Sequence, residues 1–183
     1  MFTENIHICF YCHLKLLVKG LFEDNVVKKE LIAFTIFASH EFFSAMPKIS
    51  TNSESQTESW AFSFAKSLKA GDVVALKGGL GAGKTAICRG VCKGLGFEGT
   101  VNSPSYSVVH EYPNEPPIYH LDLYRIKTAK DLYDIGIELF TFSKGITLIE
   151  WPQMAGDFPL NITHRIEIEI ISDDEREILV EIC

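Results

Sequence analysis

Residues 73–85 read Val-Val-Ala-Leu-Lys-Gly-Gly-Leu-Gly-Ala-Gly-Lys-Thr, an apolar run followed directly by a glycine-rich loop. The last eight of them match the phosphate-loop pattern G-x-x-x-x-G-K-[ST] at every fixed position. In this pattern the backbone N–H groups surround the phosphates, the lysine neutralises their charge, and the hydroxyl can bind Mg2+. The stretch therefore predicts a strand, a loop and a binding site for a nucleoside triphosphate.

A helix is expected to follow the loop, from Lys84 to about Leu95. Apolar residues recur every four positions on one of its faces, and Gly94 and Gly96 are placed to end it. The positive end of the helix dipole then adds to the attraction for phosphates. The nucleotide-binding residues that this unit predicts are Gly79, Leu80, Gly81, Ala82, Gly83, Lys84, Thr85 and Ala86.

The composition is that of one globular domain without a basic surface of its own. The chain has 183 residues, of which 46% are hydrophobic, enough for one sizeable core. Its 17 basic and 24 acidic residues leave a formal charge of -7, and no basic stripe is visible that would hold a nucleic-acid backbone. If RNA is involved, we expect a partner protein to bind it.

Cysteine usage favours a reducing, cytoplasmic location. Two of the five cysteines, Cys88 and Cys92, fall inside the predicted helix, where a disulfide framework is implausible. The stretch Cys9-Phe-Tyr-Cys12-His13 matches a haem-attachment pattern, and nearby His7 suggests zinc, but we expect neither group there. Haem attachment would need export, and no export signal is visible. No apolar run approaches the ~18 residues that a membrane span requires.

The composition of the chain changes at Met46, where a polar, loop-like stretch begins. After this stretch the predicted helices and strands follow in a regular order. We therefore predict an N-terminal extension of unknown role at 1–45, with Met46 as a candidate true start, and a phosphate-loop domain at 46–183. Ser53 and Gln56 can form a capping box at the start of a helix. The elements expected in the domain are helices at 53–68 and 128–140, strands at 72–77, 108–112, 118–123 and 146–150, and a hairpin at 164–183.

The fold class predicted from these elements is a three-layer α/β phosphate-loop domain. Its sheet is mixed, because strands that alternate with helices pair in parallel, whereas the C-terminal hairpin at 164–183 is antiparallel. Isoleucines alternate with glutamates between residues 166 and 170, so one face of this hairpin is expected to be solvated.

Two carboxylates are candidates for the rest of the site, because a phosphate loop alone does not hydrolyse anything. Glu150 follows the strand-like run Ile146-Thr-Leu-Ile149, and Asp122 lies at the end of another predicted strand, where such sheets place ligands. A solvated acid or a structural ion pair is the alternative for each. Trp151 either belongs to the core or lies against the nucleotide, and Ser105 lies in a segment that either senses the outer phosphate or forms a surface turn.

Four ordered motifs resemble the bacterial TsaE (YjeE) ATPases. They are Gly-Leu-Gly-Ala-Gly-Lys-Thr at 79–85, Ser-Pro-Ser-Tyr at 103–106, Tyr-His-Leu-Asp-Leu-Tyr-Arg at 119–125 and Ile-Glu-Trp-Pro at 149–152. The resemblance covers roughly residues 53–183. It implies an ATPase that acts with the TsaB and TsaD proteins in making threonylcarbamoyladenosine in tRNA.

The resemblance also implies roles for single residues. Lys84 and the loop amides hold the phosphates of ATP, Thr85 and Glu150 bind Mg2+, and Glu150 and Asp122 are the catalytic carboxylates. Trp151 neighbours the nucleotide. This chain departs from the family pattern at Gly79, where an aspartate is usual, and at Ser105, where a threonine is usual. We expect these two departures to alter the activity and not to abolish it.

Two other functions share the phosphate loop. A small-molecule or nucleotide kinase usually carries several arginines on a lid, whereas here the arginines are scattered along the chain. A GTP-dependent switch would carry Asn/Thr-Lys-x-Asp, and in Thr128-Ala-Lys-Asp131 the lysine stands one place late. The kinase is the stronger of these alternatives.

Overall fold

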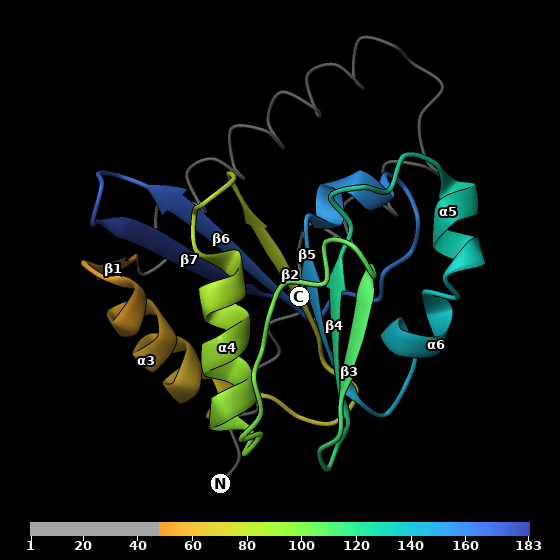
Figure 1. The fold of residues 1–183 in the computed structure, drawn as a ribbon, viewed down its shortest axis with the longest axis horizontal. Helices are drawn as coiled ribbons and strands as arrows, with labels where there is room; N and C mark the ends of the chain where they lie inside the picture. Colours follow the sequence, from red (N-terminus) through yellow and green to blue (C-terminus); the bar gives the residue numbers. More distant parts are fainter. Residues whose placement is uncertain (1–47) are drawn as a thin grey trace, which may run out of the picture. The chain divides into compact units, whose positions relative to one another are not determined.

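The computed structural model describes residues 48–183, of which residues 48–181 form one compact unit (Figure 1). The predicted extension at 1–45 and the Cys9–His13 pattern lie outside the described residues, so both remain predictions. No helix in the described part of the chain is long and apolar enough to cross a membrane.

The core of the unit is a seven-stranded mixed sheet with the strand order β1-β7-β6-β2-β5-β4-β3. Parallel pairing joins β2 to both β5 and β6 and joins β4 to β5, whereas β1–β7 and β3–β4 are antiparallel. The mixed sheet is therefore confirmed. Its strands are β1 (Ile49–Thr51), β2 (Val73–Gly78), β3 (Val109–Tyr112), β4 (Ile118–Asp122), β5 (Ile146–Glu150), β6 (His164–Ile170) and β7 (Arg176–Ile182).

Helices cover both faces of the sheet, which gives three layers. Side chains alternate along each strand, so Val74 and Leu148 join the core cluster under α3 and α4, whereas Val73 and Ile149 join the cluster under α5 and α6. In Figure 1, α3 and α4 lie side by side, apart from α5 and α6. The helices are α3 (Glu54–Phe64), α4 (Lys84–Gly94), α5 (Ala129–Asp134) and α6 (Glu138–Thr141), with short 3-10 turns η1 (Ala65–Ser67) and η2 (Pro152–Ala155).

The two helices on the loop side pack unusually closely. A Cβ atom at Gly90 would lie 2.4 Å from the carbonyl oxygen of Glu58, and one at Gly94 would lie 2.5 Å from that of Phe62. Gly94 is thus the last residue of α4 and a packing position, while Gly96, with a φ of 92°, follows the end of the helix. This contact fixes α4, the helix that follows the phosphate loop, against α3.

Helix α3 begins as predicted but ends earlier. The Ser53 hydroxyl accepts a hydrogen bond from the Gln56 amide at 3.2 Å, but the Gln56 side chain accepts from the backbone of Asn52 at 2.8 Å and not from that of Ser53, so the predicted capping box is only half formed. The α-helix stops at Phe64 and continues as the 3-10 turn η1. This turn ends where the backbone of Leu68 becomes extended. The predicted helix at 128–140 is in fact two short helices, separated at Gly136, whose φ is 63°.

The C-terminal hairpin is confirmed. Strands β6 and β7 are neighbours joined by a short turn, in which the Ile171 amide donates to the Glu175 carbonyl at 3.0 Å, and a turn this short joins antiparallel strands. Ile166 and Ile168 are buried, whereas Ile170 is half exposed. The alternation therefore buries the start of β6 and leaves its end in solvent.

Candidate functional site

The glycine-rich loop connects the carboxyl end of β2 to the first turn of α4. Lys84 is only 4% exposed, and its Nζ donates to the carbonyl oxygens of Gly78 at 3.0 Å and Gly79 at 2.7 Å. Burial lowers the pKa of Lys84, while the negative charges of Glu150 and Asp122 act in the opposite direction. The ammonium group is thus tethered across the loop, close to both candidate carboxylates.

Glu150 lies at the end of β5, between β2 and β4 in the sheet. Its strand neighbours are Leu76 on one side and Asp122 on the other. Glu150 is 3% exposed, and its Oε1 accepts a hydrogen bond from the Thr85 hydroxyl at 2.8 Å. Strand pairing therefore brings a carboxylate from 65 residues away in the chain against the first turn of α4.

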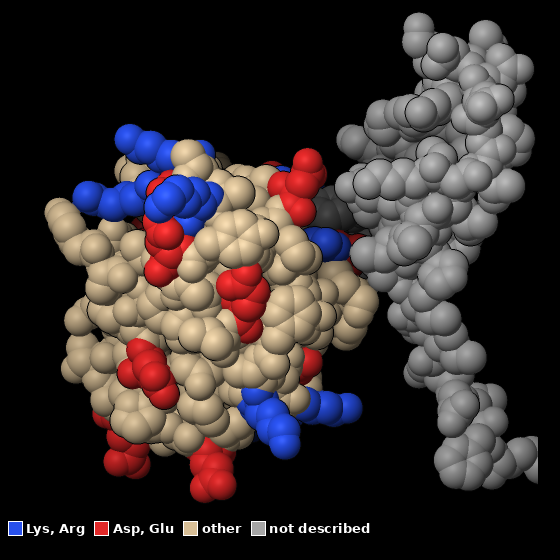
Figure 2. Space-filling view, turned by 90° about the vertical axis from the view of Figure 1, so that its right-hand side faces the viewer, with Lys and Arg blue, Asp and Glu red and all other residues tan. Residues whose placement is uncertain are grey.

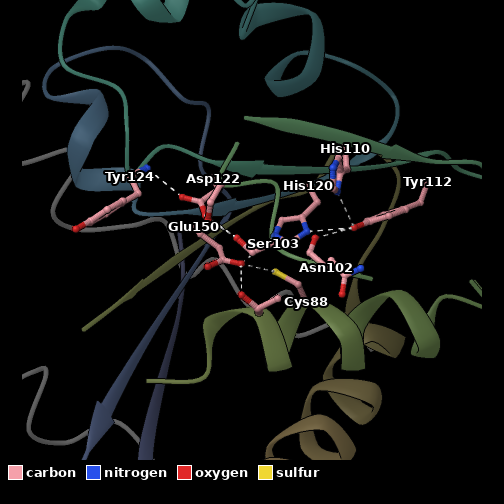
Figure 3. Close-up of polar contacts among 11 residues, drawn as sticks. Cys88, Asn102, Ser103, His110, Tyr112, His120, Asp122, Tyr124 and Glu150 are labelled. Atoms are coloured by element: carbon pink, nitrogen blue, oxygen red, sulfur yellow. Dashed lines mark hydrogen bonds and ion pairs between the residues drawn. The ribbon is translucent and has the colours of Figure 1, made fainter. Parts of the chain in front are cut away.

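Two further groups contact the same carboxylate (Figure 3). The His120 Nε2 lies 3.0 Å from Glu150 Oε1, and the Cys88 Sγ lies 4.0 Å from it. Burial raises the pKa of the Cys88 thiol well above its usual range, with the Glu150 charge adding to the effect. The thiol is therefore a weak donor to the carboxylate at neutral pH.

Asp122 is held by a different set of donors. Its Oδ2 accepts from the hydroxyls of Ser103 at 2.7 Å and Ser105 at 2.5 Å, and its Oδ1 accepts from the backbone of Tyr124 at 3.0 Å. Asp122 is 3% exposed, so the alternative of a solvated acid is wrong for both carboxylates. The segment that precedes β3 is thereby joined to the end of β4.

Trp151 lies over the phosphate loop. The Lys84 Nζ is 3.9 Å from the centroid of its ring, and the ring centroids of Trp151 and Tyr124 are 5.0 Å apart. The backbone of Trp151 is left-handed, with a φ of 59°, and this conformation is uncommon for a bulky residue and costly unless its surroundings enforce it. The tight turn after β5 therefore directs the indole to the lysine.

The structure joins six predicted site residues by contacts or strand pairing, whereas Leu80 of the loop is 80% exposed; the six are Lys84, Thr85, Ser105, Asp122, Glu150 and Trp151. It adds two residues that sequence reasoning missed. His120 precedes Asp122 by two positions, so strand alternation could have placed both on one face. Arg176 on β7 donates from Nε to the carbonyl of Ala82 at 3.2 Å and from a terminal nitrogen to that of Ser172 at 2.9 Å. No local signal announces this contact, because it depends on where β7 lies in the sheet.

The donors fit Mg2+ at one place and a softer metal at another. The hydroxyl of Thr85 and the carboxylate of Glu150 are the oxygen ligands that Mg2+ prefers. Cys88, His120 and Glu150 also present ligand atoms within 4.8 Å of one another, but sulfur and imidazole nitrogen suit zinc better. Mg2+ would therefore be held by Thr85 and Glu150, on the loop side of the carboxylate.

A parallel strand, a glycine-rich loop, a buried lysine at the start of a helix and a carboxylate on the adjacent strand define a phosphate-loop nucleotide-binding domain. Comparison with known proteins narrows this class. A family model described as "Threonylcarbamoyl adenosine biosynthesis protein TsaE" matches residues 51–178. The chain belongs to the TsaE family.

Relatives and a solved structure agree with this assignment. The tRNA threonylcarbamoyladenosine biosynthesis protein TsaE of Treponema pallidum is 33% identical over 131 residues, which is 71% of this chain and 96% of that protein. The TsaE protein of Bacillus subtilis is 38% identical over 60% of this chain and 69% of its own length. The crystal structure of Bacillus subtilis YdiB is 31% identical, with a TM-score of 0.62 over 75% of this chain and 86% of that one.

Proposed function

We propose that this protein binds and hydrolyses ATP with Mg2+ to support the synthesis of threonylcarbamoyladenosine in tRNA, together with TsaB and TsaD. The observation that carries the proposal is the convergence of Lys84, Glu150 and Asp122 beside the phosphate loop. Three strands of the sheet, β2, β5 and β4, end at this point, which is the usual place for a ligand in such a sheet.

In the proposed site the loop amides and Lys84 bind the phosphates. The Thr85 hydroxyl donates its hydrogen to Glu150, which leaves its lone pairs for a cation. Thr85 and Glu150 would hold Mg2+, which neutralises charge on the outer phosphates when bound. The indole of Trp151 lies over the Lys84 ammonium and excludes water from that side.

Asp122 is proposed as the carboxylate that orients the attacking water. Its three hydrogen bonds, from Ser103, Ser105 and the Tyr124 amide, fix its position without using every lone pair of the two oxygens. Ser105 also connects Asp122 to the segment before β3. A change in that segment on nucleotide binding would therefore be felt by the carboxylate.

The arginines favour an ATPase over a kinase. Arg89 pairs with Glu54 and Glu58, Arg125 lies 4.5 Å from the ring centroid of Tyr106, and Arg176 binds the Ala82 carbonyl. Each contacts a group of the fold, and they come from different elements. A kinase lid, by contrast, needs several arginines that converge on the transferred phosphate.

A role inside an assembly agrees with the surface charge. On the face that carries α5 and α6, Lys and Arg side chains lie near the edges with Asp and Glu spread between them (Figure 2). The whole chain carries a formal charge of -7. Partner proteins would therefore supply the tRNA contacts, and the free energy of hydrolysis would drive a conformational step in the cytoplasmic complex.

The proposal is tested by rebuilding tRNA modification from this protein, TsaB, TsaD and the small-molecule substrates, with and without ATP. We expect repeated rounds of modification only when ATP and this protein are both present. Asp122→Ala should still join the complex in an ATP-dependent pull-down but fail to sustain repeated rounds. If Asp122→Ala supports many rounds, or if the isolated protein phosphorylates a metabolite at an ordinary enzymatic rate, the kinase takes precedence.

A further inference from the structure

The two oxygens of the Glu150 carboxylate have different surroundings. Oε1 receives the Thr85 hydroxyl at 2.8 Å, the His120 Nε2 at 3.0 Å and, more weakly, the Cys88 thiol at 4.0 Å. Among the described residues, no hydrogen bond to Oε2 is found. A carboxylate with one oxygen fully engaged and the other available is oriented to offer that second oxygen to a ligand.

His120 is the strongest of these contacts that does not belong to the phosphate loop. Its side chain is fully buried on β4, where its strand partner is Leu148, two residues before Glu150. An ionised carboxylate has no hydrogen to give, so the bond requires a hydrogen on the His120 Nε2. The histidine is therefore a fixed donor, carried by a strand in the middle of the sheet.

The other side of the histidine ring is also held. The Tyr112 hydroxyl lies 3.4 Å from His120 Nδ1, 3.5 Å from His110 Nδ1 and 3.3 Å from the Asn102 carbonyl oxygen, so these acceptors share its single hydrogen (Figure 3). The Tyr112 ring packs on Phe97 with centroids 4.9 Å apart. A chain of contacts thus runs from the β3 strand through His120 to Glu150.

We propose that His120 is a positioning residue for the Mg2+ site: it holds Glu150 so that Oε2 faces the cation, with Tyr112 fixing the imidazole behind it. The inference rests on the proposed function, because it assumes that Glu150 binds Mg2+. Groups that hydrogen-bond to a metal ligand fix its orientation, and their loss typically weakens metal binding about 10–100-fold. Without the His120 donor, Glu150 keeps only the Thr85 hydroxyl and the weak Cys88 contact, so the direction of Oε2 is less tightly fixed.

The test compares two amide substitutions. His120→Gln places a side-chain N–H close to the position of Nε2, so the donor to Glu150 is kept. In His120→Asn the shorter amide reaches only the position of Nδ1, so the contact with Tyr112 is kept and the donor to Glu150 is lost. Both are polar, buried and smaller than the ring. The readouts are the Mg2+ dissociation constant of the ADP-bound protein by calorimetry, and ADP affinity in EDTA.

We expect His120→Asn to weaken Mg2+ binding about tenfold or more and His120→Gln to stay within about threefold of the original protein. ADP affinity in EDTA should be the same for all three proteins. Unchanged Mg2+ binding in His120→Asn overturns the inference, and so does an equal loss in both variants, since ring packing would then explain it. If the original protein shows no Mg2+ dependence of ADP binding, the proposed metal site itself fails.

A second pair of variants applies even if changes at His120 unfold the protein. Tyr112→Phe removes the hydroxyl that faces Nδ1 and keeps the ring against Phe97. Tyr119→Phe, on β4, is the matched control, because its ring packs on Phe140 away from this chain of contacts. We expect about a threefold loss of Mg2+ affinity for Tyr112→Phe and none for Tyr119→Phe. Equal affinities in the two variants would contradict the role of Tyr112.

Discussion

The two halves of the site are built differently. Glu150 is anchored by residues of regular elements, Thr85 on α4 and His120 on β4. Asp122 is anchored mainly by Ser103 and Ser105, which lie in a segment without helix or strand between α4 and β3. The contrast teaches that the Glu150 half, which we propose binds the cation, is preformed by the sheet and helix, whereas the Asp122 half, proposed to act in hydrolysis, depends on a loop.

The largest expected effect separates these halves by their chemistry. Asp122→Ala should lower the rate of ATP hydrolysis about a thousandfold while leaving ATP affinity nearly unchanged, because it removes the group that we propose orients the attacking water. Glu150→Gln should also bind nucleotide but hydrolyse poorly, and its nucleotide binding should depend less on Mg2+ than that of Asp122→Ala. Calorimetry and single-turnover hydrolysis on both variants measure the difference. Identical behaviour of the two variants would remove the distinction between the halves.

The next effect tests whether the loop lysine belongs to the preformed half. Lys84→Ala should weaken ATP binding about a hundredfold, because charge-assisted hydrogen bonds to the phosphates are lost. Lys77→Ala is the control, since Lys77 lies near the end of β2, just before the loop, and pairs with Glu167 at the surface. Equal ATP affinity in Lys84→Ala and Lys77→Ala would show that the phosphates bind elsewhere.

A smaller effect reports on Trp151, which contacts the loop from the turn after β5. Its fluorescence should change on adding Mg-ATP, because the Lys84 ammonium now 3.9 Å from the ring centroid would turn toward the phosphates. The other tryptophan, Trp60, stacks on Phe64 in the α3 layer with centroids 5.6 Å apart. The titration is repeated with Trp151→Phe, and a signal of unchanged size there would assign the change to Trp60.

The smallest effect is expected from deleting residues 1–45. The contacts that build the site lie between residues 76 and 176, beyond the deleted segment. The shortened protein that begins at Met46 should therefore keep nearly the same ATP affinity and melting temperature. Thermal unfolding and ATP titration of the two chain lengths measure this. An insoluble product beginning at Met46 would place the domain boundary earlier in the chain.

Elements with a local signature could be predicted closely from the sequence. Helix α4 begins at Lys84, as the phosphate-loop pattern requires, and β5 spans Ile146–Glu150, the strand predicted from its mostly apolar residues. Element ends without such a signature were less accurate. Leu68 follows the helical spacing of α3, but it lies beyond the end of the helix, where an extended backbone packs it against the core.

The sequence by itself determined the phosphate loop, the mixed α/β sheet and the positions of Glu150 and Asp122 at strand ends, because each depends on short-range spacing and on the alternation of side chains. Only the tertiary structure decided that His120 contacts Glu150 and that Arg176 contacts the Ala82 carbonyl. Those contacts depend on the order in which β2, β5 and β4 pair and on where β7 lies. Strand order is set by packing across the whole sheet, which no short stretch of the chain encodes.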